Sequence, residues 1–306
     1  MKTQQLHVFV TVASEKSLRG AARRLGLTSP GIMRTIQELE ADLGVPLMTR
    51  SSRGVELTEF GRALEIRANQ LLHDIQRARD ELQQMNGEMV GQVRFGCSAA
   101  VALTILGSTL SRFREAAPLA QVSVSEERLP LAAHRVRDGS LDFIASHGMS
   151  GTVDDGLRKI PLFTSPFIVM ACEQHPLVHA TTLEELTNAE WFVPASYDGQ
   201  HHSIMADAFS AANLPVPRRT IRYTSFSPAL GLVADANVIG IFPGVLGEKL
   251  ARLGLRQIAL EIPLPKIETD VVMRNGAPLT PVSQHFLNCL VESANRLTRQ
   301  GQSTGE

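Results

Sequence analysis

The sequence predicts an α/β protein that begins with a small all-α domain carrying a β-hairpin wing. Two short helical patterns joined by a tight turn precede a hairpin within residues 17–58. An apolar repeat of about 3.5 residues follows over residues 60–85. Strand and helix patterns then alternate from residue 92 onwards. The expected strands are 92–97, 121–126, 141–146, 167–172, 191–195, 220–224, 238–242 and 269–273. The expected helices are 101–114, 130–138, 183–186, 203–212, 228–234, 244–250 and 282–297. This alternation is typical of a sheet of parallel strands covered by helices.

The N-terminal patterns fit a helix-turn-helix. Apolar residues recur on one face of residues 17–25, where Ser17 is a natural N-cap and Gly26 can adopt the positive φ that ends the helix. The second helix starts at residues 28–30, where a hydroxyl cap precedes a proline. Its buried stripe is narrow, and the start of its outer face is small, polar or basic.

This distribution suits a helix that enters a DNA major groove, because its first residues must approach base edges without steric obstruction. The residues expected to contact bases or backbone there are Thr28, Ser29, Pro30, Gly31, Met33, Arg34 and Thr35. Two short strands around residues 51–54 predict a wing, and Arg50, Ser52 and Arg53 are expected to hold it to phosphates. The alternative is a helical pair that only packs.

Residues 59–87 predict a long helix that ends near Gly87 and Gly91. Its apolar seam is Phe60, Leu64, Ala68, Leu71, Ile75, Ala78, Leu82 and Met85. We expect Phe60, Leu64, Leu71, Ile75 and Leu82 to pair with a second copy, which would supply the two recognition helices of a two-fold DNA site. Packing of this seam on its own domain is the alternative.

The run AARRLGLTSPGIMRTIQELEADLGVPLMTRSSRGVELTEFG resembles the N-terminal signature of LysR-type transcriptional regulators. The family pattern has an Ala-Ala pair, a Ser-Gln-Pro-Ala-Val-Ser turn, Leu-Glu, Leu-Gly, Leu-Phe-x-Arg and Leu-Thr-x-x-Gly. Here Ser29 replaces Gln, Gly31 replaces Ala, Met33 replaces Ser and Met48 replaces Phe. These changes keep size and pattern, so the expected fold carries over. Three of them lie at the DNA-facing start of the helix, so the base preference does not.

The resemblance extends over essentially the whole chain through the weaker motifs RDGSLDFIAS, ACEQHPLVHATTLEEL and VIGIFP. It implies a winged helix-turn-helix domain (1–58), a linker helix (59–87) and an effector domain (92–300) of two Rossmann-like subdomains (92–164 with 270–300, and 165–269) that resemble a periplasmic-binding-protein type 2 fold. It also implies a ligand-responsive regulator that binds promoter DNA as paired dimers of a homotetramer. The expected partners are double-stranded DNA at an imperfect palindrome, a small-molecule effector, further copies of the chain and RNA polymerase.

Ligands of parallel α/β sheets bind beyond the carboxyl ends of strands, where helix N-termini present free N–H groups. The candidate effector-binding residues are Ser98, Ala99, Ala100, Leu129, Pro130, Ser146, His147, Tyr197, Ser225, Phe226, Phe242 and Pro243. Hydroxyls and helix-end amides suit an acid group and rings suit an organic body, so a small anionic or aromatic effector is expected. The stretches FGCSAAVAL and RDGSLDF also resemble a family member that responds to an aromatic sulfonate.

Each of these candidates has a purely structural alternative. Ser98 and Ser225 are equally good helix caps, and Phe242 fits a core position better than a pocket wall. His147, which with His201 and His202 is the nearest positive candidate, equally well caps a loop.

Composition sets the remaining bounds on the 306-residue chain. Its net charge is −1, but residues 1–62 hold nine basic and six acidic side chains, a modest bias that assists DNA binding. The sequence has no signal-peptide start and no apolar run of 18 residues, and its three cysteines are widely spaced. These features predict a cytoplasmic protein with no membrane contact.

Other functions fit the sequence less well. No G-x-S-x-G elbow or P-loop occurs, so neither an enzyme nor a cofactor is expected. A metal site at His175 and His179 is disfavoured because Pro176 disrupts a helical pair of ligands, and a redox role for Cys97 lacks a resolving cysteine nearby. The alternative from another class is a cytoplasmic solute-binding module with an N-terminal protein-contact domain, against which the N-terminal motif and the seam argue.

Overall fold

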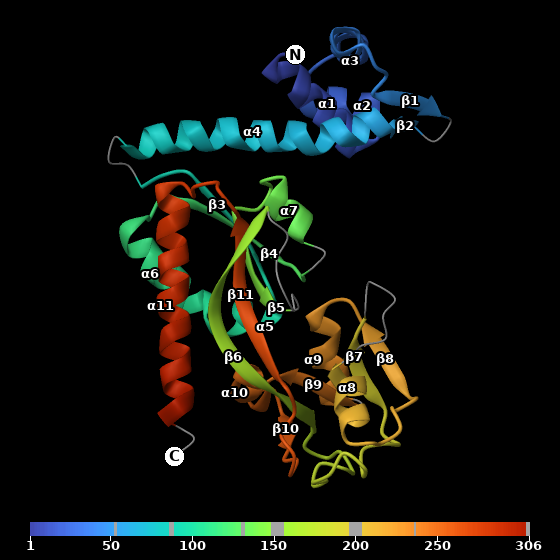
Figure 1. Cartoon of the computed structure of the whole chain (residues 1–306), viewed down its shortest axis with the longest axis vertical. Helices are drawn as coiled ribbons and strands as arrows, with labels where there is room; N and C mark the ends of the chain where they lie inside the picture. Colours follow the sequence, from blue (N-terminus) through green and yellow to red (C-terminus); the bar gives the residue numbers. More distant parts are fainter. Residues whose placement is uncertain are drawn as a thin grey trace.

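The computed structural model describes residues 1–51, 54–85, 89–129, 132–147, 156–195, 204–235 and 237–303. A small N-terminal domain lies on the first half of a long helix, and the larger part of the chain lies on the opposite side of that helix (Figure 1). The two termini lie at opposite ends of the molecule in this view.

The N-terminal domain is a three-helix unit with a hairpin. It contains α1 (Thr3–Glu15), α2 (Leu18–Leu25), α3 (Ser29–Leu43) and the antiparallel pair β1 (Met48–Ser51) and β2 (Gly54–Leu57). The Ser17 hydroxyl accepts a hydrogen bond from the Gly20 amide at 3.2 Å, and Gly26 ends α2 with a φ of 65°. The predicted helix-turn-helix and its caps are confirmed.

The core of this domain is apolar throughout. Its buried side chains include Leu6, Phe9, Val12, Ala21, Ile32, Ile36, Leu39, Leu47 and Ala68. Ala68 belongs to the next helix, α4 (Glu59–Met85), so the long helix is packed into the DNA-binding domain rather than flexibly attached to it. Its first amides are capped by Thr58, whose hydroxyl accepts from the Gly61 amide at 3.0 Å.

The larger part is built on one mixed sheet. Within the described residues its strand order is β4-β3-β5-β11-β6-β9-β7-β8, with β10 paired to β6. The strands are β3 (Gln92–Cys97), β4 (Gln121–Glu126), β5 (Phe143–His147), β6 (Leu157–Cys172), β7 (Trp191–Pro194), β8 (Thr220–Tyr223), β9 (Ile239–Pro243), β10 (Leu255–Ile258) and β11 (Lys266–Arg274). Strands β4, β3 and β5 are parallel, as are β8, β7 and β9.

Two long strands, β6 and β11, pair antiparallel with each other between these two sets, and β11 also pairs antiparallel with β5 of the first set, as β6 does with β9 of the second. They join two subdomains, as the resemblance implied and as Figure 1 shows. The helices of the first subdomain are α5 (Ala99–Thr104), α6 (Leu106–Ala116), α7 (Ala133–Arg137) and α11 (Pro281–Ser303). Those of the second are α8 (Ile204–Ala211), α9 (Phe226–Asp235), the 3-10 turn η1 (Gly244–Leu246) and α10 (Gly247–Ala251).

Three expectations about local structure were wrong. The helix expected over 183–186 is a series of turns, because its amides bond the carbonyls three residues back, as Leu186 does to Leu183, rather than four residues back. The helix expected over 101–114 is two helices that meet at Ile105. The sheet is mixed rather than purely parallel because β11 pairs antiparallel with β5, and β6 pairs antiparallel with β9 and β10. Strand β6 also begins at Leu157, ten residues before the strand that the sequence indicated.

Candidate DNA-binding interface and effector site

The start of α3 is open to solvent and rigidly capped. The Thr28 hydroxyl accepts a hydrogen bond from the Gly31 amide at 3.2 Å, which fixes the first turn of the helix. Thr28, Pro30 and Gly31 are exposed and Ser29 is half-buried. Small side chains at this end leave the helix backbone accessible, which is the geometry that base-edge contacts need.

Further along α3, Arg34 extends into solvent with 83% of its side chain exposed, and its Nε donates to the Glu38 carboxylate at 2.9 Å. The Thr35 hydroxyl is turned back onto the Gly31 carbonyl at 3.0 Å, and Met33 is half-buried on the flank. Arg34 is therefore the one long side chain among the predicted contacts in α3 that can reach a groove, and Glu38 holds it along the helix.

The wing is fixed at both ends. The Glu40 carboxylate at the end of α3 accepts from the amides of Leu47 and Met48 at 2.6 and 3.2 Å. Gly54 has a φ of 122°, and a side chain there would lie 2.5 Å from the Lys16 carbonyl. Ser52, Arg53 and the side chain of Arg50, which the sequence assigns to DNA, lie outside the described residues.

The linker helix exposes much of its apolar side and buries several polar residues, the reverse of the usual arrangement in a surface helix. On the side away from both domains, Phe60, Leu71, Leu82 and Met85 are 54, 43, 66 and 76% exposed. On the opposite side Arg77, Asp80 and Gln84 are buried. Leu64 and Ile75 are half-buried at the edge of the seam. Leu64 and Ala68 of the seam pack on the core of the N-terminal domain, so the alternative of packing on its own domain holds for that part. A monomeric helix normally buries its apolar side, and the rest of the seam stays largely exposed in the single chain.

The buried polar side of α4 binds the effector domain through hydrogen bonds. Gln70 donates to the Arg137 carbonyl at 2.9 Å. Gln84 donates to the Val90 carbonyl at 2.7 Å and accepts from the Val282 amide at 3.0 Å. The Asp74 carboxylate accepts from Arg77 on the same helix and from Arg274 at the end of β11, at 2.7 and 2.9 Å. The linker helix is thus tied directly to one of the two crossover strands.

The carboxyl ends of β3, β4 and β5 meet at one edge of the first subdomain. Cys97 pairs with both Glu126 and Ala145, and the Ser98 amide donates to the Ala145 carbonyl at 2.9 Å. Ser98 is 2% exposed, and its hydroxyl has no hydrogen-bond partner among the described residues and does not cap α5. The helix-cap alternative for this hydroxyl is thereby wrong.

The other predicted residues at this edge are mostly enclosed. Ala100, Leu129 and Ser146 are buried and Ala99 is half-buried. Burial, reinforced by the positive charge of Arg128, lowers the pKa of His147 to about 4, so its imidazole is neutral at physiological pH. The expectation that His147 supplies positive charge was wrong.

The second subdomain faces this edge through the start of α9. The Phe226 amide donates to the Glu126 carboxylate across the two subdomains at 3.4 Å. Phe226 packs edge-on against Phe242, which is 1% exposed in the core. Ser225 is exposed and Pro243 half-buried. Pro130, Tyr197, His201 and His202 lie outside the described residues.

Sequence reasoning missed three polar residues near these strand ends. They are Glu126, Arg128 and Tyr223. The ring of Tyr223 stacks on Phe192 with centroids 4.5 Å apart, and burial raises the pKa of its hydroxyl to about 12. The sequence could have indicated these three residues, because each lies at or near the carboxyl end of a strand that it predicts.

The remaining candidates are explained by local structure. Burial and two neighbouring carboxylates raise the pKa of Cys97 to about 12, which keeps it a thiol and disfavours redox sensing. A ring nitrogen of His175 accepts from the Leu177 amide at 3.1 Å in a turn. In the described residues no group of three or more metal-ligating side chains is found, nor any helix long and apolar enough to cross a membrane.

A winged helix-turn-helix joined by a long helix to a two-subdomain ligand-binding fold defines a one-component, DNA-binding transcriptional regulator. The comparisons identify the family. Residues 3–62 match the bacterial regulatory helix-turn-helix model of the lysR family, and residues 86–295 match the LysR substrate binding domain. The chain belongs to the LysR family of DNA-binding transcriptional regulators.

Named relatives agree with this assignment. The transcriptional regulator TdcA of Escherichia coli (strain K12) is 30% identical over 79% of this chain and 77% of its own length. GbpR of Rhizobium radiobacter is 29% identical over 76% of this chain and 78% of its own. These relatives are transcriptional regulators rather than enzymes.

Solved structures share the fold over nearly the full length. The LysR family regulator CbnR superposes with a TM-score of 0.70 at 21% identity, covering 96% of this chain and 99% of its own. CbnR in complex with its target DNA superposes with a TM-score of 0.68 at 22% sequence identity, covering 96% of this chain and 100% of its own. A full-length OxyR variant from Pseudomonas aeruginosa superposes with a TM-score of 0.68 at 22% sequence identity, covering 96% of this chain and 95% of its own.

Proposed function

We propose that this regulator reads promoter DNA through residues 28–35 of α3, with Arg34 as the residue that selects a base. Arg34 is the long, exposed donor on an otherwise small surface, and an arginine at this place can bind a guanine edge. The wing, including Arg50, Ser52 and Arg53, would contact the backbone. A regulator of this kind acts where the promoter is, so we assign it to the bacterial cytoplasm.

We further propose that two copies pair through the apolar seam of α4. The supporting observation is that Phe60, Leu71, Leu82 and Met85 are exposed on one side of the helix, while polar residues on another side are hydrogen-bonded to the effector domain. Additional contacts between effector domains, where Leu103 and Val124 are 39 and 43% exposed, would assemble paired dimers on one promoter. RNA polymerase would then be the partner at that promoter.

The proposed effector is a small organic anion bound where the strand ends of the two subdomains meet. The observation that carries this proposal is the Ser98 hydroxyl, which is buried without a partner among the described residues and can donate to an acid group. Arg128 supplies positive charge to the same edge, and Phe226 supplies a half-buried ring. An aromatic sulfonate or a related aromatic acid is the first class to test.

Effector binding would act through a difference in affinity between two arrangements of the subdomains. The crossover strand β11 links the strand-end edge to α4, because its Arg274 binds Asp74 at 2.9 Å. Closure around a ligand would therefore move the linker helix and alter the spacing of paired DNA-binding domains. Unchanged DNA footprints and bend angles with and without effector would contradict this mechanism.

Arg34→Ala is expected to relax base preference at one position of each half-site, at a cost of about 1–3 kcal/mol on the preferred sequence. Arg53→Ala is the matched comparison, because loss of a phosphate contact should weaken all DNA equally and reduce the salt slope by about one. Binding measured on a set of single-base variants distinguishes the two. The opposite pattern would exchange the roles of the two arginines.

A screen of organic acids and sulfonates should find a compound that stabilises the full chain, by about 2.7 kcal/mol at a hundredfold excess over Kd. Ser98→Ala should weaken that compound about tenfold to a hundredfold, since it removes a hydrogen bond to a charged group. The variant itself should keep its stability because the hydroxyl has no partner among the described residues. Ser111→Ala on the exposed face of α6 serves as control. If the two variants bound the compound with equal affinity, the strand-end edge at Ser98 would be excluded as its binding site.

A further inference from the structure

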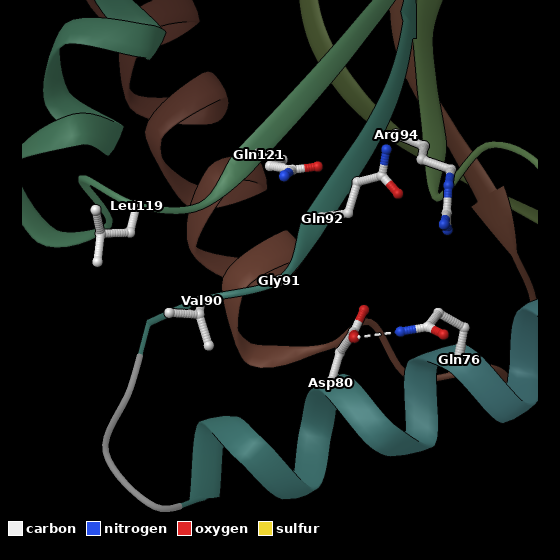
Figure 2. Close-up of a pocket in the computed structure, with 8 residues that line it drawn as sticks. All are labelled: Gln76, Asp80, Val90, Gly91, Gln92, Arg94, Leu119 and Gln121. Carbon is white, nitrogen blue, oxygen red and sulfur yellow. Dashed lines mark hydrogen bonds between the residues drawn. The ribbon is translucent and has the colours of Figure 1, made fainter.

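A cavity lies between the linker helix and the effector domain, away from the strand-end edge. It has a volume of about 560 Å³ and opens between α4 and the first residues of β3 and β4 (Figure 2). Its walls include Gln76 and Asp80 from α4, Gly91 and Arg94 from the β3 side, and Leu119 and Gln121 from the β4 side. The volume is within the range of pockets that hold small molecules.

Asp80 supplies an incompletely neutralised carboxylate to this cavity. The residue is 7% exposed, and its carboxylate accepts one hydrogen bond, from the neutral amide of Gln76 at 2.8 Å. Among the described residues it has no cationic partner. A buried carboxylate normally requires a cation or several donors, so this side of the cavity favours a group that carries N–H donors and positive charge.

Arg94 supplies the opposite charge from the facing wall. Its backbone amide donates to the Asp142 carboxylate at 2.9 Å, and Asp142 also accepts from the Ser283 hydroxyl at 3.0 Å, so the strand is fixed. The side chain extends from β3 towards α4 (Figure 2) and makes no hydrogen bond or ion pair with any other described residue.

The remaining wall is polar and shaped to keep the space open. Gly91 has a φ of 112°, and a side chain there would come within 2.9 Å of the Gln84 amide nitrogen. Gln121 adds an amide without a hydrogen-bond partner among the described residues, and Leu119, which is 79% exposed, forms an apolar edge. The cavity therefore offers a carboxylate, a guanidinium and amides, with one apolar contact.

We propose that this cavity is a second ligand site, for a small zwitterion such as a free α-amino acid. The ammonium group would bind Asp80, and the carboxylate would bind Arg94. Asp80 and Arg94 do not form an ion pair with each other in the described structure, whereas one zwitterionic molecule could pair with both side chains. The site lies where α4 joins the effector domain, so its occupancy would stabilise the docked arrangement of the linker helix whichever effector binds the strand ends.

The test uses the full-length protein with each common L-α-amino acid in turn, followed by calorimetric titration. At least one amino acid is expected to raise the Tm of the wild type, whereas acetate and methylammonium, which carry one charge each, should not at the same concentration. Asp80→Asn and Arg94→Gln should each weaken binding about tenfold to a hundredfold, the loss of one charge-assisted hydrogen bond.

Both variants should remain folded, because an asparagine in place of Asp80 can still accept from Gln76, and the Arg94 side chain has no partner of its own in the described chain. No shift with any amino acid, or a shift that persists in both variants, would overturn the proposal. A shift that Ser98→Ala removes and the other two variants retain would place the amino acid at the strand-end edge. That result would overturn the second site while supporting the proposed effector site.

Discussion

Leu82→Glu is expected to dissociate the regulator into monomers and to weaken promoter binding at least a hundredfold. Leu82 is 66% exposed on the seam of α4, although it is a large apolar side chain. Pairing would bury it in both copies, and each burial contributes about 1.5–3 kcal/mol. Two copies therefore lose about 3–6 kcal/mol, which corresponds to a weakening of roughly a hundredfold to ten-thousandfold. Sedimentation measures the dissociation directly.

Gln83→Glu is the matched control, because it introduces the same charge at the adjacent exposed position, about 100° around the helix from Leu82. It should leave both the dimer and the DNA affinity unchanged. The folded state of each chain should survive in both variants, since neither position is buried in the monomer. A Leu82→Glu protein that stays dimeric would show that another surface makes the dimer.

The helices of the N-terminal domain and their caps were predictable because local rules govern them. The caps at Ser17, Thr28 and Gly26 each involve hydrogen bonds to residues at most four positions away, and the structure places each in the cap that the sequence indicated. The apolar seam was predictable for the same reason, since its periodicity is a property of one helix. What the sequence did not reveal is that the opposite, polar side of α4 is buried.

The effector domain was harder to predict because its determinants are non-local. Nothing within residues 157–166 shows that they extend β6 against β11, since that pairing joins segments about a hundred residues apart. The electrostatics of His147 depend on burial and on Arg128, neither of which periodicity records. Asp80 and Arg94 belong to different elements, and only the docking of α4 on β3 brings them to one cavity.

Gly61→Ala is expected to destabilise the DNA-binding domain by about 1–3 kcal/mol and to weaken all promoter binding. A methyl group there would lie 2.0 Å from the Leu47 carbonyl oxygen and 3.3 Å from the Leu57 Cβ. The carbonyl cannot retreat freely, because it accepts from the Thr58 amide at 3.0 Å. The start of α4 must then move away from the wing, and this cost exceeds the gain in helix propensity of about 0.5–1 kcal/mol.

Gly107→Ala in α6 is the matched control. It is also a glycine near the start of a helix, but a Cβ there meets no atom within 4 Å, so the variant should be stabilised by about 0.5–1 kcal/mol. Amide hydrogen exchange across residues 3–62 is the appropriate measurement, because the single tryptophan, Trp191, is buried in the second subdomain and does not monitor the N-terminal domain. Unchanged protection in Gly61→Ala would show that α4 can shift away from the wing at little cost, and the linker helix would then be a flexible joint rather than part of the DNA-binding domain.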